Sequence, residues 1–268
     1  MIRPRKRPSR DHYQARMNNV GWFCYLIVSV CFASLPLVAA QVDAPFDKAN
    51  ILYEQGDYKA AAEAYRTLIE NGGGSAATYF NHGNALYQSG KIGQALVEYH
   101  HALAANPRDP DILANIQFTR EKLGPSVVMP RSFWQQFLLQ VTLNEWTILT
   151  IIPFWIWLFV AGLKAFQGGQ RPALSVVAKL SGFVFVGLAL ILLVATNERL
   201  GKEYAIVTAA EAVVRFGPFE ESKSSHNLVD GIEVQLLDYK NGWHQIRDPK
   251  GQLGWLNQES VRQLPALP

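Results

Sequence analysis

Cysteine is almost absent from this chain of 268 residues. The two cysteines, Cys24 and Cys31, both lie in a hydrophobic stretch near the N-terminus. If that stretch is removed as a leader, no thiol remains, which excludes disulfide bonds, CxxC redox chemistry and cysteine-ligated metal. The sequence also lacks a GxSxG motif, an HExxH motif and a phosphate-cradling glycine loop. We therefore expect neither an enzyme nor a bound cofactor.

The six histidines do not indicate a metal site either. His82 occupies an expected packing position, and His100 and His101 are neighbours on one expected helix. Adjacent residues on a helix do not share a face, so this pair cannot chelate one ion. No metal-ligating residues are predicted.

Acidic residues are missing from residues 164–179, which connect two apolar runs at 146–163 and 180–196. Each run is close to the length that crosses a bilayer as a helix. Short connections rich in Lys and Arg remain in the cytoplasm. We expect a two-helix hairpin in the inner (cytoplasmic) membrane, with a cytoplasmic loop and both flanking parts on the extracytoplasmic, periplasmic side.

Residues 1–40 have the pattern of a secretory signal peptide. Six basic residues and one acidic residue precede an apolar stretch. The stretch ends in Val38-Ala39-Ala40, which predicts cleavage after Ala40. The alternative is an uncleaved signal anchor, because the apolar run is long. Both versions send the following residues across the membrane.

The charge is distributed unevenly along the chain. Residues 41–124 contain seven basic and ten acidic residues, and residues 197–268 contain eight and ten. Both parts expected to be soluble are thus mildly acidic, which argues against nucleic acid as a partner.

Residues 42–75 and 76–109 align over 34 residues without a gap, the period of tetratricopeptide repeats (TPR). Gly56-Asp57-Tyr58 corresponds to Gly90-Lys91-Ile92, and Tyr65 corresponds to Tyr99. Residues 83–90 and 95–99 resemble the TPR consensus closely. The resemblance implies an all-α TPR solenoid over residues 42–124, with two repeats and a capping helix. So short an array is near the lower limit of stability; self-association or packing near the membrane would cover its missing surface.

In TPR domains, ligands bind along the concave face formed by the first helix of each repeat. Carried over by position, this face comprises Asn50, Tyr53, Asn81, Asn84, Tyr87 and Asn115. Asparagine amides donate and accept at once, so they can pair with the backbone of an extended peptide. The alternative is that these amides only cap and bridge the helices of the array.

Residues 125–145 begin with a short linker. Aromatic and aliphatic residues then recur at helical spacing between glutamines, which indicates an amphipathic helix in the membrane interface. The alternative is a simple N-terminal extension of the first membrane helix.

Short β-rich runs separated by turns begin at Glu203. Residues 231–237 alternate as a strand does, and Asn241-Gly242 supplies a tight hairpin turn into Trp243. Five short strands favour a small closed barrel. Together with the segments 213–218 and 251–256, this pattern resembles the bacterial SH3-like domain, here residues 203–264. Tyr239, Trp243 and Trp255 are the candidate ligand surface; alternatively, the two tryptophans complete the core.

Signal, TPR array, membrane hairpin and SH3-like domain, in that order, resemble the BatE family of aerotolerance-operon proteins. The resemblance implies membrane-anchored von Willebrand factor A proteins as partners, a MoxR-type AAA+ ATPase as an indirect partner, and a role in envelope stress tolerance. We expect a membrane-anchored adaptor that binds proteins through both modules. The alternative is a sensor or anchor whose SH3-like domain binds peptidoglycan.

Overall fold

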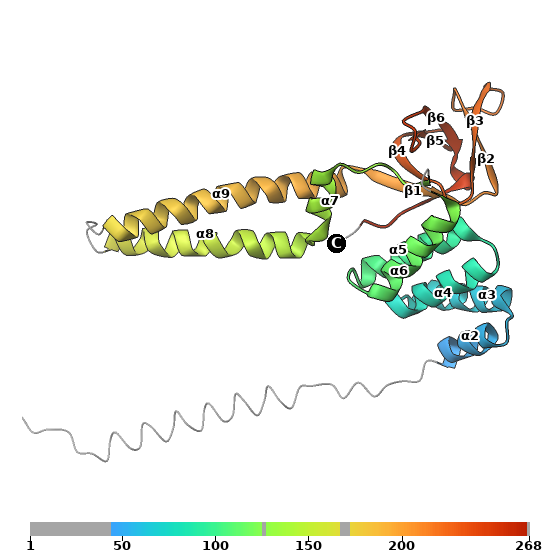
Figure 1. Cartoon of the computed structure of the whole chain (residues 1–268), viewed down its shortest axis with the longest axis horizontal. Helices are drawn as coiled ribbons and strands as arrows, with labels where there is room; N and C mark the ends of the chain where they lie inside the picture. The colour runs from blue at the N-terminus through green and yellow to red at the C-terminus, as the bar shows by residue number, and fades with distance from the viewer. Residues whose placement is uncertain (1–43, 125–126, 167–171, 267–268) are drawn as a thin grey trace, which may run out of the picture. The chain divides into compact units, whose positions relative to one another are not determined.

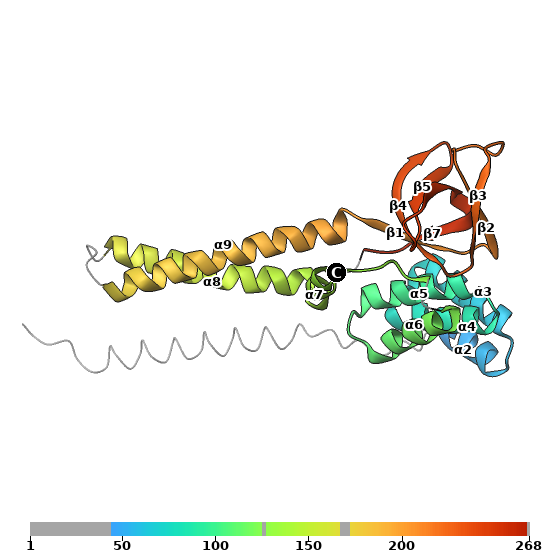
Figure 2. The same cartoon turned by 45° about the horizontal axis from the view of Figure 1, so that its top comes forward.

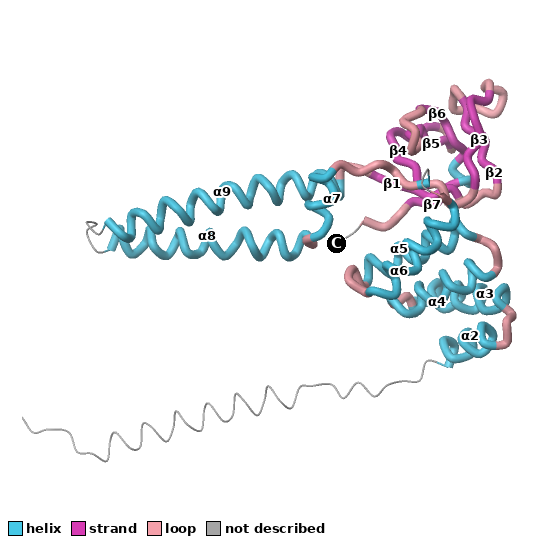
Figure 3. The backbone as a smooth tube through the Cα atoms, in the orientation of Figure 1, coloured by secondary structure: helices cyan, strands magenta, loops and turns pink. Residues whose placement is uncertain are grey.

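The computed structural model describes residues 44–124, 127–166 and 172–266 (Figure 1). The expected signal peptide, residues 1–40, lies outside the described residues. The described chain is mostly helical and ends in an antiparallel sheet (Figure 3). The first part, which we call the helical array, consists of α2 (Ala44–Glu54), α3 (Tyr58–Leu68) with the π-helical turn η1 (Ile69–Gly73), α4 (Ala76–Gln88), α5 (Ile92–Ala105) and α6 (Pro110–Leu123).

The helical array repeats one hairpin. In both hairpins a glycine ends the first helix with a positive φ, 80° at Gly56 and 79° at Gly90, a conformation that costs glycine no steric strain. The second helices begin at Tyr58 and Ile92, one 34-residue period apart. The period seen in the sequence therefore appears as repeated backbone geometry.

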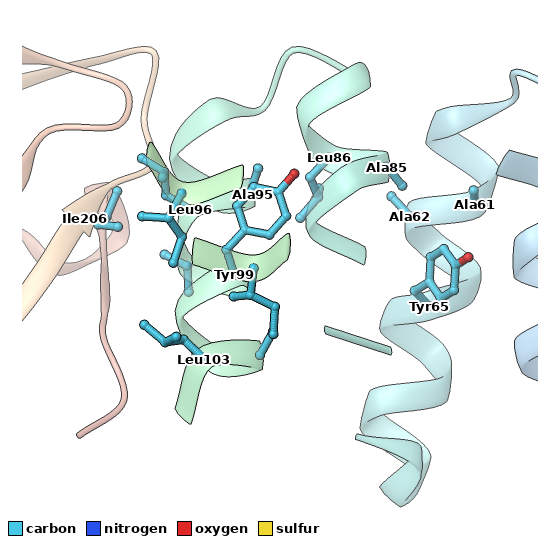
Figure 4. Close-up of a cluster of buried hydrophobic side chains, with 14 of the residues drawn as sticks. Ala61, Ala62, Tyr65, Ala85, Leu86, Ala95, Leu96, Tyr99, Leu103 and Ile206 are labelled. Atoms are coloured by element: carbon cyan, nitrogen blue, oxygen red, sulfur yellow. The ribbon is translucent and has the colours of Figure 1, made fainter. Parts of the chain in front are cut away.

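Alanines and tyrosines fill the core of the array. Ala61, Ala85 and Ala95 are fully buried, so neighbouring helices approach closely, and the rings of Tyr65 and Tyr99 occupy the space beside them (Figure 4). Small residues at contact points and large rings between them keep the interior closely packed.

Two long helices follow the array: α8 (Leu143–Phe166) and α9 (Pro172–Leu200) lie side by side (Figures 1 and 2). Both are long and apolar enough to cross a membrane. They extend beyond the apolar runs expected from sequence, so Lys164 and Lys179 lie inside helices rather than in the connection.

A separate short helix, α7 (Phe133–Gln140), precedes the hairpin rather than extending α8. Ser132 and Gln135 form a capping box at its start. At its end, Arg199 of α9 donates to the carbonyl oxygens of Leu138 and Val141 at 3.1 and 2.5 Å. These bonds satisfy helix-terminal carbonyls and attach α7 to the hairpin.

The C-terminal part is one seven-stranded antiparallel sheet with strand order β3-β2-β6-β5-β4-β1-β7. Its strands are β1 (Glu203–Val207), β2 (Glu211–Arg215), β3 (Ser224–Val229), β4 (Glu233–Lys240), β5 (Trp243–Arg247), β6 (Leu253–Asn257) and β7 (Val261–Gln263). The expectation of five strands was therefore too low: β3 and β7 are additional. Their core is aliphatic, with Val207, Val214, Val234 and Ile246 fully buried.

The sheet and the helical array are joined by a helix cap. In the first hairpin, Asp57 caps α3 by accepting from the backbone N–H of Ala60. Lys91 occupies the same place before α5 and makes no side-chain cap. Instead Asp230, from the turn between β3 and β4, accepts from the N–H of Gly93 at 3.0 Å. A carboxylate from the sheet thus completes a helix of the array.

Gly93 is required for this contact. A Cβ at this position would lie 2.2 Å from both the Asp230 carboxylate and the carbonyl oxygen of Val207. Any side chain would separate α5 from the sheet.

The second joint is an ion-pair cluster around Glu233, whose side chain is 2% exposed. Its carboxylate lies 2.9 Å from Arg120 of α6 and 3.4 Å from Arg131 of the segment before α7. Arg120 also contacts His100 of α5 at 3.2 Å. One buried carboxylate therefore connects the array, the sheet and the segment leading to the hairpin.

Apolar packing continues across the same contact. Ile206 of β1 is 1% exposed and belongs to the hydrophobic cluster of the array, beside Leu96 (Figure 4). Self-association and the membrane were the expected covers for the array; in the structure the sheet packs against α5.

We predict that Glu233→Gln destabilises the protein by about 3 kcal/mol, because Arg120 loses its charged partner in a buried site. Thermal unfolding in detergent and hydrogen exchange in α6 measure the effect. Glu259→Gln, at an exposed position of the same domain, is the control and should change neither. Equal stability of both variants would contradict the ion-pair role.

A pH effect is expected from His100. Burial, with Arg120 nearby, lowers its pKa from 6.5 to about 3. The unfolded chain takes up a proton below pH 6.5 while the folded chain does not, so stability falls as the pH drops from 6.5 towards 3, by up to about 1.4 kcal/mol per pH unit. His100→Gln should flatten this dependence in pH-resolved unfolding, and His101→Gln should leave it. If His100→Gln kept the wild-type dependence of stability on pH, a group other than His100 would be responsible for it.

Candidate functional site

Asparagine side chains of successive hairpins are hydrogen-bonded to one another, an arrangement we call the amide ladder. In the first unit, the Asn50 Oδ1 of α2 accepts from the Tyr65 hydroxyl at 2.5 Å and from Asn81 Nδ2 at 3.1 Å. Asn81 belongs to α4 and Tyr65 to α3, so one oxygen connects three helices.

The same unit recurs one repeat later. Asn84 Oδ1 accepts from the Tyr99 hydroxyl at 2.8 Å and from Asn115 Nδ2 at 2.9 Å. Burial raises the pKa of the Tyr99 phenol, which therefore remains a donor. The amides thus bridge neighbouring helices, as one of the two alternatives expected. The other alternative, ligand binding, requires hydrogen-bonding groups that these bridges leave unused.

Two donors of the amide ladder remain open. Each shared oxygen uses both lone pairs, but the Nδ2 groups of Asn50 and Asn84 donate to no acceptor among the described residues. A cavity of about 90 Å³ lies at these groups. Its lining residues are Asn50, Tyr53, Glu54, Tyr65, Asn81 and Asn84. The cavity thus offers two amide donors, one period apart, to carbonyl oxygens.

The structure brings together four of the six expected groove residues in this cavity and links Asn115 to it through Asn84. Tyr87 packs instead against Phe118, with ring centroids 5.9 Å apart. The hydrogen-bonding roles of Tyr65 and Tyr99 were not predicted from the sequence. Their signal was the spacing of fifteen residues from Asn50 and from Asn84, which is the same in both repeats.

The three aromatic residues considered on the sheet do not form one surface. Gln245 pairs with Trp255, and Trp243 lies two residues before Gln245, so the two tryptophans share one face. Tyr239 pairs with His244 and lies on the other face. Trp243 is buried, Trp255 is half-buried and Tyr239 is exposed.

Residues 208–263 match the family model of the bacterial SH3 domain. The match covers β2 to β7 and confirms an SH3-like fold for the sheet. The same comparison gives no TPR or BatE match. A comparison with curated proteins finds no match.

Proposed function

We propose that the protein is a non-catalytic, membrane-anchored adaptor that binds an extended segment of a partner protein in the amide-ladder cavity. The observation that carries this proposal is the pair of unengaged amide donors, Asn50 Nδ2 and Asn84 Nδ2, beside one cavity. Donors repeated at one structural period suit successive carbonyl groups of a peptide backbone. A TPR-type array is the architecture that this repetition favours.

The anchoring part of the proposal rests on α8 and α9. If these two helices span the inner membrane, the contacts of Asp230 and Glu233 with the array require both modules to lie on one face. Lys164 of α8 and Lys179 of α9 flank the connection, and basic residues that flank a short connection favour its cytoplasmic location and hence a periplasmic location for that face. Only the short connection between α8 and α9 would then face the cytoplasm, together with the N-terminus if the signal is uncleaved.

The BatE-like order of segments suggests which partners the adaptor serves. We propose membrane-anchored von Willebrand factor A proteins as direct partners in an envelope-stress complex. A cytoplasmic MoxR-type ATPase would be reached through one of these membrane proteins. The net acidic charge of both modules supports protein rather than nucleic acid as partner.

Cell-wall binding is the second candidate function. Bacterial SH3 domains commonly bind peptidoglycan or proteins. Tyr239 offers an exposed ring that lies beside the ring of His244, with centroids 4.9 Å apart and planes tilted by 51°. Binding to cell wall that is independent of the array would favour this candidate.

A photocrosslinking residue in place of Glu54, at the cavity, tests the adaptor proposal in intact membranes. Asn50→Asp with Asn84→Asp keeps the oxygens that accept from Tyr65 and Tyr99 but replaces both donors with negative oxygen. Two lost hydrogen bonds at about 1 kcal/mol each should lower the crosslinked yield by about tenfold or more.

Asn71→Asp is the matched control, because its side chain does not line the cavity. It should leave crosslinking unchanged. Unchanged crosslinking in the double variant, with its thermal unfolding preserved, would contradict binding in the cavity.

Topology is tested by single cysteines introduced at Asn71, Ala173 and Lys250 in a chain with Cys24 and Cys31 replaced by serine. A membrane-impermeant maleimide should label positions 71 and 250 in spheroplasts. It should label position 173, at the start of α9, only after permeabilisation. Labelling of position 173 in intact spheroplasts would indicate the opposite orientation of the hairpin.

A further inference from the structure

A second cavity, of about 640 Å³, lies between the helical array and β7. We call it the interdomain cleft. Helices α3, α4 and α5 form one wall, and Arg262 and Gln263 of β7 form the other. No residue lines both this cleft and the amide-ladder cavity. The cleft is therefore a separate site that requires both modules.

The lining of the cleft has more cations than anions, with four Lys or Arg side chains against two Glu side chains. Arg66 is held by Glu63 and Glu70. Lys59, Lys91 and Arg262 are exposed and form no ion pair within the described residues, although the charge of Lys91 helps to lower the pKa of Glu63. Both modules are net acidic, so a group of free cations here opposes the composition around it. Charge of this sign favours an anionic ligand.

Two buried polar groups on the wall of the cleft lie within ion-pair distance of each other. His82 is 6% exposed, and its Nδ1 makes no hydrogen bond. Glu98 Oε2 lies 3.4 Å from this nitrogen, within ion-pair distance, and makes no hydrogen bond either. Both atoms are closed off from the surface, so the pair belongs to the wall of the cleft, and the exposed cations are the groups that a ligand can reach.

The lining is mixed rather than uniformly charged. Apolar Ala62, Leu86 and Val97 lie among the cations, together with the hydroxyl of Ser89 and the amide of Gln94. Amide and hydroxyl groups suit a peptide backbone, and the apolar side chains suit its uncharged residues. Glu63 and Glu98 in the same lining would repel a densely charged polyphosphate or nucleic acid.

We propose that the interdomain cleft binds a carboxylate-bearing, extended peptide segment of a partner protein. Its carboxylates contact Lys59 and Lys91 from the array and Arg262 from the SH3-like domain. The site is complete only while Asp230 and Glu233 hold the two modules together. It does not depend on the amide-ladder cavity, so the two proposals can fail separately.

The test uses the full chain in nanodiscs of neutral lipid and a fluorescein-labelled peptide of alternating glutamate and serine. A peptide with glutamine in place of glutamate reports binding without charge. Fluorescence anisotropy should show binding at least about tenfold tighter for the glutamate peptide, weakening with salt.

Lys91→Glu with Arg262→Glu reverses one cation on each wall and should weaken binding by about tenfold or more. The control is Lys48→Glu with Lys240→Glu, which makes the same change in net charge outside the cleft and should change affinity by less than about twofold. Lys91→Gln with Arg262→Gln, checked by thermal unfolding, provides a milder variant if the charge reversals disturb the start of α5.

Three outcomes would overturn the proposal: equal affinity for the glutamate and glutamine peptides, equal weakening in the cleft and control variants, or tighter binding of inorganic polyphosphate than of the glutamate peptide at equal charge. Asn50→Asp with Asn84→Asp should leave binding of the glutamate peptide unchanged. Loss of binding in that variant would indicate that the glutamate peptide needs the amide-ladder cavity, so that the cleft is not a separate site.

Discussion

Helix α5 has no capping side chain of its own, and the carboxylate of Asp230 takes that place from 137 residues away. A helix terminus is therefore satisfied only when the SH3-like domain is docked. Glu233 adds a buried ion pair beside it, and ion pairs of this kind specify geometry more than they add stability. Because both contacts join the array to the sheet, the interdomain cleft, which is lined by both, depends on this joint.

Local features were predictable from the sequence because they repeat or have strong turn chemistry. The 34-residue period gave the hairpins, and Asn241-Gly242 gave the turn between β4 and β5. Strand β3 was missed, since Ser224–Val229 begins with residues of low strand propensity, and β7 is only three residues long. The family match to the bacterial SH3 domain independently supports the reading of residues 208–263.

The joint was not predictable, because no local pattern pairs Asp230 with Gly93 or Glu233 with Arg120. The sequence contains one indication of the joint: Asp57 is a good capping residue, whereas Lys91, at the equivalent position of the next repeat, is not. The candidate site likewise has one feature that was predictable from the sequence and one that was not. The asparagines were found by position, whereas their shared hydrogen bonds to Tyr65 and Tyr99 depend on how three helices pack. Tyr239 and the tryptophans of the sheet were grouped by type, and strand register separated them.

The contact between Gly93 and Asp230 also bears on how the chain reaches its final form. Helices α8 and α9 lie between these residues in the sequence, so α5 is synthesised long before its cap. Contacts of such large sequence separation form late in folding. If the hairpin inserts with its two ends on opposite faces, Asp230 and Glu233 never meet the array, and the first module stays incomplete. If α8 and α9 span a membrane, insertion with both ends on one face is thus a condition for completing the fold. A chain inserted otherwise would leave the open end of the array accessible to proteases.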